Sequence, residues 1–254
     1  MVPSTYYYRV IKIGIVELTY DNLLTTILAI INLIKSTIVK TECKVHKFIN
    51  IFAFKILRND KYFDAYNILS CYIKEINDGV VWADQDFKSL SHFYNPVQKR
   101  GLYGRKSAMD LGVDYYNKAV FLWKHGEYSK SCFYLGACLH IIQDMVIPQH
   151  ANIRLLDNHR QFETYVKRTY EHIDEFHIDK GAYRLKSIEH YIKFNARVAL
   201  KIDKKFKYIS DDETRFYRIT RCIIPLAERT TAGAMVMFFN DIMESGMDFS
   251  LKNA

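Results

Sequence analysis

Glycine and proline are scarce in this sequence, with 10 and 4 residues among 254. Because these residues most often interrupt helices, their scarcity argues against a turn-rich fold and allows long helices to run unbroken. Hydrophobic residues make up 49% of the chain, enough for one large core without a second domain. We therefore predict an all-α fold with a single globular multi-helix domain over residues 41–254.

Cysteine is also sparse, and the longest apolar run is short. Five cysteines without tight pairing argue against a disulfide framework and favour a reducing compartment. The apolar residues 23–34 are too few for a confident membrane span. Acidic residues precede this run and no small-x-small cleavage site follows it, so no convincing signal peptide is present. Residues 1–40 are predicted to be a separate N-terminal helical, apolar segment without an assigned role, the alternative being a degenerate export or anchor segment.

The charge balance is basic, with a net charge of +8. An excess of lysine and arginine favours anionic partners, which include phosphorylated ligands, nucleic acid and acidic membrane surfaces. The net charge alone does not choose among them.

Apolar residues recur at helical spacing along most of the chain from residue 43 onward. We predict roughly nine helices in total, with Gly79 ending one of them and an aromatic-rich loop following over residues 80–103. Pro148 is expected to end another helix. The predicted segments are 43–58, 61–78, 104–125, 127–147, 159–175, 185–206 and 211–245.

One segment, 140-HIIQDMVIPQH-150, concentrates metal-ligand chemistry. His140 and Asp144 are four residues apart, so both side chains leave the same face of a helix. His150 follows the proline, where the chain can turn back. His159 and Glu163 repeat the four-residue spacing. Imidazole nitrogen and carboxylate oxygen are the ligands that zinc accepts in catalytic sites.

Further candidate ligands lie upstream. Asp84 and His92 flank part of the predicted loop, and Cys43 and His46 form a C-x2-H pair at a helix start. Each pair alone is most often an ordinary core hydrogen bond or part of a solvated helix face. Their joint occurrence beside apolar segments favours a metal, because burying so many ionisable groups without a cation is costly.

These residues resemble the bacterial zinc-dependent phospholipases C, enzymes of all-α fold with three zinc ions. The resemblance rests on 133-FYLGACLHIIQDMVIPQHAN-152, 91-SHFYNP-96 and 230-TTAG-233. It implies a first zinc held by Asp84, His92, His140 and Asp144, a second held by His150, His159 and Glu163, and a third held by His46 with bridging Asp144. The chain is similar to short members of the family that lack a C-terminal lipid-binding domain.

In the family the third ion is completed by an N-terminal tryptophan, which this sequence does not place near His46. We hypothesise that the Cys43 thiolate takes that position. The alternative is an ordinary cysteine at the start of a helix.

The resemblance implies hydrolysis of the glycerol-side phosphodiester bond of phospholipids at a membrane surface by a zinc-activated water, with two to three Zn²⁺ as cofactor. Asp84 is the first candidate for the general base and Glu163 the second. The rivals are a zinc-dependent single-strand nuclease or other phosphodiesterase, for which nucleic acid would be the partner, and a decayed metal-binding helical protein. The family implies secretion, whereas the missing signal peptide leaves a cytoplasmic or membrane-peripheral location open; headgroup preference and oligomeric state are not specified.

Overall fold

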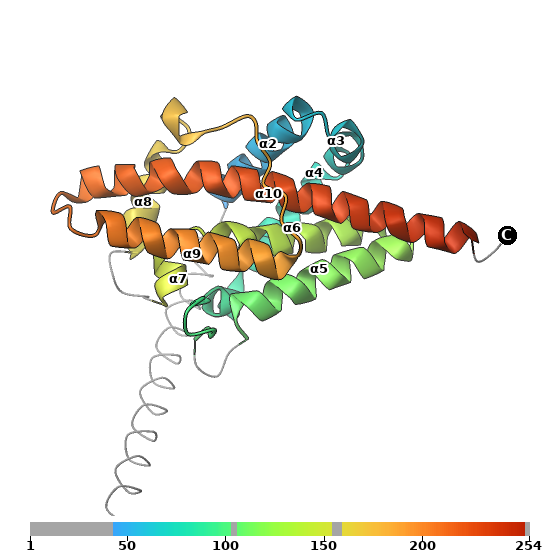
Figure 1. Cartoon of the computed structure of the whole chain (residues 1–254), viewed down its shortest axis with the longest axis horizontal. Coiled ribbons are helices and arrows are strands. Elements are labelled where there is room, and N and C mark those ends of the chain that lie inside the picture. The colour runs from blue at the N-terminus through green and yellow to red at the C-terminus, as the bar shows by residue number, and fades with distance from the viewer. Residues whose placement is uncertain (1–42, 103–105, 154–158, 252–254) are drawn as a thin grey trace, which may run out of the picture.

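The structure is a computed structural model that describes residues 43–102, 106–153 and 159–251. The predicted N-terminal segment 1–40 lies outside the described residues. Within them the fold is all-α, as predicted, with nine α-helices, two short 3-10 helices and no strand (Figure 1). The elements are α2 (Lys44–Asn59), α3 (Phe63–Ser70), α4 (Ile73–Ala83), η1 (Asp86–Ser91), α5 (Ala108–Lys124), α6 (Tyr128–Asp144), α7 (Pro148–Asn152), α8 (His159–Thr169), η2 (Asp174–Phe176), α9 (Ile188–Phe206) and α10 (Asp212–Leu251).

Helix α6 is the centre of the core. Every residue from Leu135 to Asp144 is buried, and α4, α5, α9 and α10 surround the helix (Figure 1). A helix buried on all sides needs no polar face, which explains the continuous apolar run in its sequence. Its last turn carries the polar residues His140, Gln143 and Asp144, so the fold places these groups inside the protein.

Two glycines allow α4 and α6 to pack backbone against backbone. A Cβ atom on Gly79 would lie 1.8 Å from the Phe133 carbonyl oxygen, and one on Gly136 would lie 1.9 Å from the Ile76 carbonyl oxygen. The prediction that Gly79 ends a helix is therefore wrong. Helix α4 runs through Gly79 to Ala83. Glycine is needed at this position because the close packing against α6 leaves no room for a side chain.

Local sequence signals set other boundaries. Ser107 and Asp110 form a reciprocal capping box at the start of α5. Helix α6 ends at Asp144, four residues before Pro148. Ile147 is extended, and Pro148 then occupies the first turn of a new short helix, α7. The chain therefore turns sharply between Asp144 and His150.

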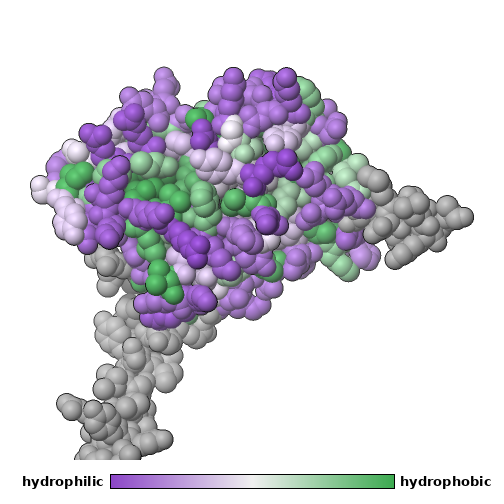
Figure 2. All heavy atoms as spheres, viewed as in Figure 1, coloured by the Kyte–Doolittle hydropathy of each residue, from purple (hydrophilic) through white to green (hydrophobic). Residues whose placement is uncertain are grey.

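Helix α10 spans the molecule (Figure 1). Among the described residues it is the one helix long and apolar enough to cross a membrane, but 72% of its apolar stretch is buried inside the fold. It acts here as a core helix, packed on α2, α9 and α6. The face shown in Figure 2 is mostly hydrophilic, with hydrophobic residues gathered in places between the hydrophilic ones.

Candidate metal centre

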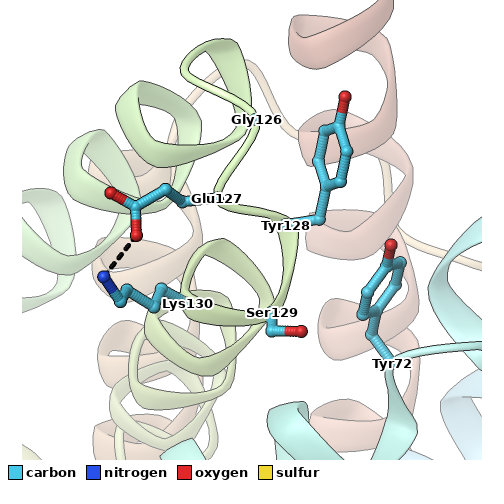
Figure 3. A pocket seen from close by; sticks show the side chains of 6 residues that line it. All are labelled: Tyr72, Gly126, Glu127, Tyr128, Ser129 and Lys130. Carbon is cyan, nitrogen blue, oxygen red and sulfur yellow. Dashed lines mark ion pairs between the residues drawn. The ribbon is translucent and has the colours of Figure 1, made fainter.

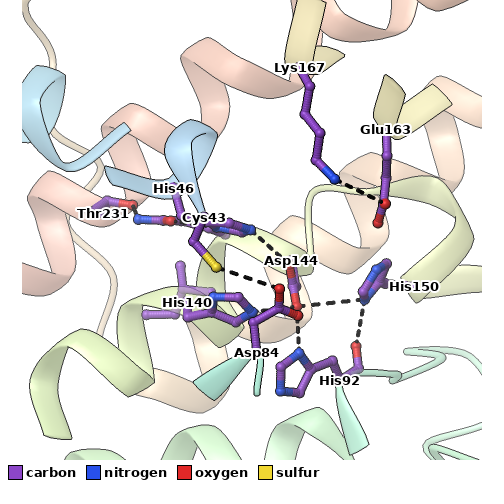
Figure 4. A network of polar contacts seen from close by, with 12 residues as sticks. Cys43, His46, Asp84, His92, His140, Asp144, His150, Glu163, Lys167 and Thr231 are labelled. Atoms are coloured by element: carbon purple, nitrogen blue, oxygen red, sulfur yellow. Dashed lines mark hydrogen bonds and ion pairs between the residues drawn. The ribbon is translucent and has the colours of Figure 1, made fainter. Parts of the chain in front are cut away.

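The candidate ligands come together from six elements, at or near whose ends they lie (Figure 4). α6 supplies two ligands from its last turn, α8 supplies two from its first turns, and the other four each lie on a different element. In chain order they are His46 on α2, Asp84 at the end of α4, His92 at the end of η1, His140 and Asp144 on α6, His150 on α7, and His159 and Glu163 on α8.

These side chains form three groups of potential ligands. The groups are His46 with His140 and Asp144, Asp84 with His92 and His140, and His150 with His159 and Glu163. Within each group the ligand atoms all lie within 4.8 Å of one another. Every histidine and carboxylate that the sequence singled out as a ligand belongs to at least one group.

Asp144 is the hub of the cluster. Its Oδ2 lies 2.8 Å from His92 Nδ1 and 3.1 Å from His140 Nε2, and its Oδ1 lies 3.5 Å from His46 Nε2. The two oxygens thus face different imidazoles (Figure 4). A carboxylate in this position is suited to bridging two ions.

Outer hydrogen bonds fix two of the imidazoles. Gln143 donates through Nε2 to Asn50 Oδ1 (2.9 Å) and Thr231 Oγ1 (3.1 Å), so its Oε1 is left to accept from His46 Nδ1 at 2.8 Å. His150 Nδ1 donates to the His92 carbonyl oxygen at 3.0 Å. In both histidines the Nε2 lone pair is then free for a metal, the arrangement that outer-shell partners impose on metal-binding histidines.

Three of these side chains have protonation states that suit a cation, whereas the Asp144 carboxylate outweighs burial and raises the pKa of His140, so a metal would have to displace that proton. Burial and the neighbouring His140 lower the pKa of His46 to about 4, and burial lowers the pKa of His92. Burial acts to raise the pKa of Asp144, but the imidazoles of His140, His150 and His92 outweigh it and hold that pKa well below its ordinary range. At neutral pH the two imidazoles are neutral and the carboxylate is ionised, as metal ligation requires.

One buried atom points to a missing partner. His92 is fully buried, and its Nε2 has no hydrogen-bond partner among the described residues. Leaving such an atom unsatisfied in the interior is costly. The other ligand atoms around it are imidazole nitrogens and carboxylate oxygens. Zinc binds these two kinds of ligand in catalytic sites, so the cluster fits zinc.

Cys43 lies beside the cluster but outside the three groups. Its thiol donates to Asp84 Oδ2 at 3.5 Å (Figure 4). Burial and the Asp84 carboxylate raise the pKa of this thiol above its ordinary value. Its role as a ligand therefore stays a prediction.

The sequence did not single out Gln143, Asn50 or Thr231, although all three are buried polar residues that support His46. The available signal was weak. Gln143 is a lone amide in an apolar helix, one residue before Asp144, and Thr231 lies in the family-like segment 230–233.

One depression of the surface lies far from the cluster. It is lined by Tyr72 and residues 126–130 at the start of α6, and its polar groups include the Glu127–Lys130 ion pair (Figure 3). The helix rise places it about 24 Å from Asp144 at the other end of α6. The metal-ligand cluster is therefore the stronger candidate for a functional site.

Some known proteins are similar to this chain in sequence, and others are similar to it in fold. A family model described as zinc dependent phospholipase C matches residues 45–211. The phospholipase C of Listeria monocytogenes is 31% identical over 124 residues, which cover 44% of this chain and 42% of that protein. The α-toxin of Clostridium absonum superposes with a TM-score of 0.68 at 20% identity, covering 78% of this chain and 63% of the toxin.

The α-toxin of an avian Clostridium perfringens strain superposes with a TM-score of 0.64 at 17% identity and the same coverage. At these identities the structural likeness concerns the fold. The chain spans less than half of the Listeria protein and somewhat under two thirds of the two toxins. The matched residues 45–211 contain all eight histidine and carboxylate candidates.

Proposed function

The chain belongs to the zinc-dependent phospholipase C family, and on this premise we propose that it hydrolyses the glycerol-side phosphodiester bond of phospholipids. The products would be diacylglycerol and a phosphorylated headgroup. The observation that carries the proposal is the convergence of five histidines and three carboxylates in three groups at the ends of six elements. The proposed cofactor is two to three zinc ions.

Zinc bound by these groups would lower the pKa of a coordinated water to about 7 and neutralise phosphate oxygens in the transition state. The protein must then hold its ligands in place. Gln143 and the His92 carbonyl orient two imidazoles, and the closely packed α4 and α6 fix Asp84 relative to His140. Such preorganisation means that little rearrangement is needed during the reaction.

Asp84 is the proposed general base. Its carboxylate belongs to the group with His92 and His140, is partly exposed, and has one oxygen accepting from Cys43. A carboxylate that would lie beside bound zinc and also reaches the solvent boundary could take a proton from an attacking water. Glu163 is the second candidate, and its Oε2 lies 3.7 Å from Lys167 Nζ.

The test is product analysis on phospholipid vesicles of mixed headgroups with zinc present. We expect the wild-type protein to release diacylglycerol and phosphorylated headgroup, and Asp84→Asn to lose this activity by at least about a hundredfold, the typical contribution of a general base. Asp114→Asn, which changes an exposed carboxylate on α5, is the matched control and should keep full activity. A wild-type protein that retains its zinc yet forms no diacylglycerol would refute the proposal.

The rival phosphodiesterase function is tested with single-stranded nucleic acid in the same zinc-loaded preparation. The basic charge of the chain and the sequence 82-WAD-84, which resembles that of the zinc-dependent nucleases, favour it. The intact set of ligands in the structure argues against the third reading, a decayed site, since loss of function should remove ligands first.

A further inference from the structure

Helix α9 presents a row of cations to solvent. Lys193, Arg197, Lys201 and Lys205 are exposed and follow one another at intervals of four residues, with exposed Lys204 beside them. Residues at this spacing share one face of a helix, and twelve residues of helix rise by about 18 Å. Hydrophilic side chains gather over α9 in the view of the molecule shown in Figure 2.

Most of this row, the α9 stripe, is not neutralised by its own helix. The two acidic residues of α9 are half-buried: Glu189 lies one turn before Lys193 and interacts with it, and Asp203 accepts a hydrogen bond from Asn152 of α7 at 2.8 Å. In the described part of the chain, Arg197, Lys201 and Lys204 form no ion pair. Like charges four residues apart destabilise a helix, so helix stability does not explain the row.

A rigid turn with an exposed aliphatic tip follows Tyr94, which hydrogen-bonds to α7, the short helix that also packs on α9. Asn95 closes this turn: its backbone pairs with Arg100 and its Oδ1 accepts from Val97 N at 2.9 Å and Gln98 N at 3.0 Å. Val97 is 77% exposed, the highest value among the large aliphatic residues described. Lys99 is exposed beside it.

The turn is attached directly to the candidate metal centre. Phe93 stacks on the His150 ring with centroids 4.8 Å apart, and the Tyr94 amide donates to the His150 carbonyl at 3.2 Å. Helix α7, which carries His150, also packs on α9, where Asn152 of α7 donates to Asp203 at 2.8 Å. The turn, the stripe and the ligand His150 therefore belong to one connected region.

We propose that the α9 stripe and the turn at residues 95–100 form a docking face for a membrane surface rich in anionic phospholipids. This inference rests on the proposed function, because docking would bring the substrate to the metal centre. Lysine and arginine near a membrane are attracted to anionic headgroups, and an exposed valine can enter the headgroup boundary. Tyr208, which is 81% exposed at the end of α9 with Lys207 4.7 Å from its ring centroid, suits the same interface.

The composition of the face favours lipid over nucleic acid. Surfaces that bind single strands combine cations with several aromatic rings on which successive bases stack. Here Tyr208 is the one highly exposed aromatic residue assigned to the face, the exposed residue of the turn is aliphatic, and the cations form a straight row along a helix. A flat anionic surface is the partner that matches both features.

The test measures binding of the zinc-loaded full chain to vesicles of phosphatidylcholine with and without phosphatidylglycerol. We expect the wild-type protein to bind the anionic vesicles more tightly and to lose this binding as salt is raised. The variant K193E/R197E/K201E should bind them at least about tenfold more weakly. The variant K61E/K124E/K180E, which reverses three exposed lysines elsewhere on the surface, is the matched control and should retain most of the binding.

V97D should weaken binding to both kinds of vesicle, since it removes the apolar contact. Zinc content and thermal unfolding check that each variant is folded, and K193Q/R197Q/K201Q replaces the charge-reversed variant if that protein does not fold. Equal losses in the stripe and control variants would overturn the proposal, as would a loss of binding to single-stranded DNA without a loss on vesicles.

A separate assay keeps this inference distinct from the proposed function. Wild-type hydrolysis of a short-chain phospholipid dispersed as monomers reports on the metal centre without a surface. Hydrolysis of monomers with no stripe-dependent vesicle binding would refute only the docking face. Stripe-dependent binding with no hydrolysis of monomers or vesicles would support the docking face and refute the proposed function.

Discussion

The Cys43 thiol lies 3.5 Å from Asp84 Oδ2, where it can serve either as a hydrogen-bond donor or, after turning towards His46, as a zinc ligand. Serine keeps the donor but not the soft thiolate. If the thiolate is a ligand, as the sequence predicts, Cys43→Ser should bind one zinc ion fewer in native mass spectrometry. Cys71→Ser changes an exposed cysteine and serves as the control. An unchanged zinc count in Cys43→Ser would make the thiol only a donor to Asp84.

Single residues show what the sequence could and could not predict about the site. The spacing of His159 and Glu163 predicts their contact, and the structure places His159 Nε2 3.2 Å from Glu163 Oε1. Spacing cannot reveal partners that are distant in the chain. Gln143 meets Asn50 across 93 residues, and His177, which lies among charged residues in the sequence, is paired with fully buried Glu228 at 2.7 Å.

At the level of elements, the contact between α4 and α6 should control both stability and metal binding. A methyl group in Gly136→Ala would meet the Ile76 carbonyl at 1.9 Å, so the helices must separate. The cost of such overpacking, about 1–3 kcal/mol, exceeds the gain of about 1 kcal/mol from the higher helix propensity of alanine. Because Asp84 directly follows α4 and His140 lies in the last turn of α6, zinc affinity measured by competition with a chelating dye should also fall.

The control for this prediction is Asn117→Ala, which changes an exposed residue of α5. Alanine is the better helix former, so we expect unchanged or slightly higher stability in thermal unfolding and unchanged zinc affinity. If Gly136→Ala behaved like Asn117→Ala in both measurements, the close packing of α4 and α6 would not be what positions Asp84.

Element boundaries were predictable where local chemistry sets them. Helices α2, α5, α6 and α9 begin and end within a few residues of the predicted limits. The boundaries that were predicted wrongly are set by contacts between helices that are distant in the sequence. Gly79 is a helix-breaking signal locally, yet it lies inside α4 because Phe133 of α6 leaves no space for a side chain. The segment after it also folds into η1, which delivers His92.

At the level of the whole molecule, the fold places its polar cluster where helix ends converge around buried α6. The all-α class follows from composition and periodicity, which act everywhere along the chain. The arrangement of the helix ends around the cluster does not follow from composition or periodicity, because it depends on backbone contacts such as that between Gly136 and Ile76. The cluster therefore joins α2, α4, η1, α6, α7 and α8 into one unit that only the folded chain can form.

This dependence predicts that zinc should stabilise the entire fold. A ligand that binds only the native state at a concentration about a thousand times its Kd adds about 4 kcal/mol to the free energy of unfolding. For a chain of this size each kcal/mol raises Tm by about 2–4 °C, so calorimetry should show a rise of about 8–16 °C between chelated and zinc-loaded protein. His150→Gln/Glu163→Gln, which removes two ligands of one group, should show a smaller rise, and Mg²⁺, which prefers oxygen ligands, should produce almost none. Equal Tm values with chelator and with saturating zinc would mean that the three groups do not hold ions in the folded protein.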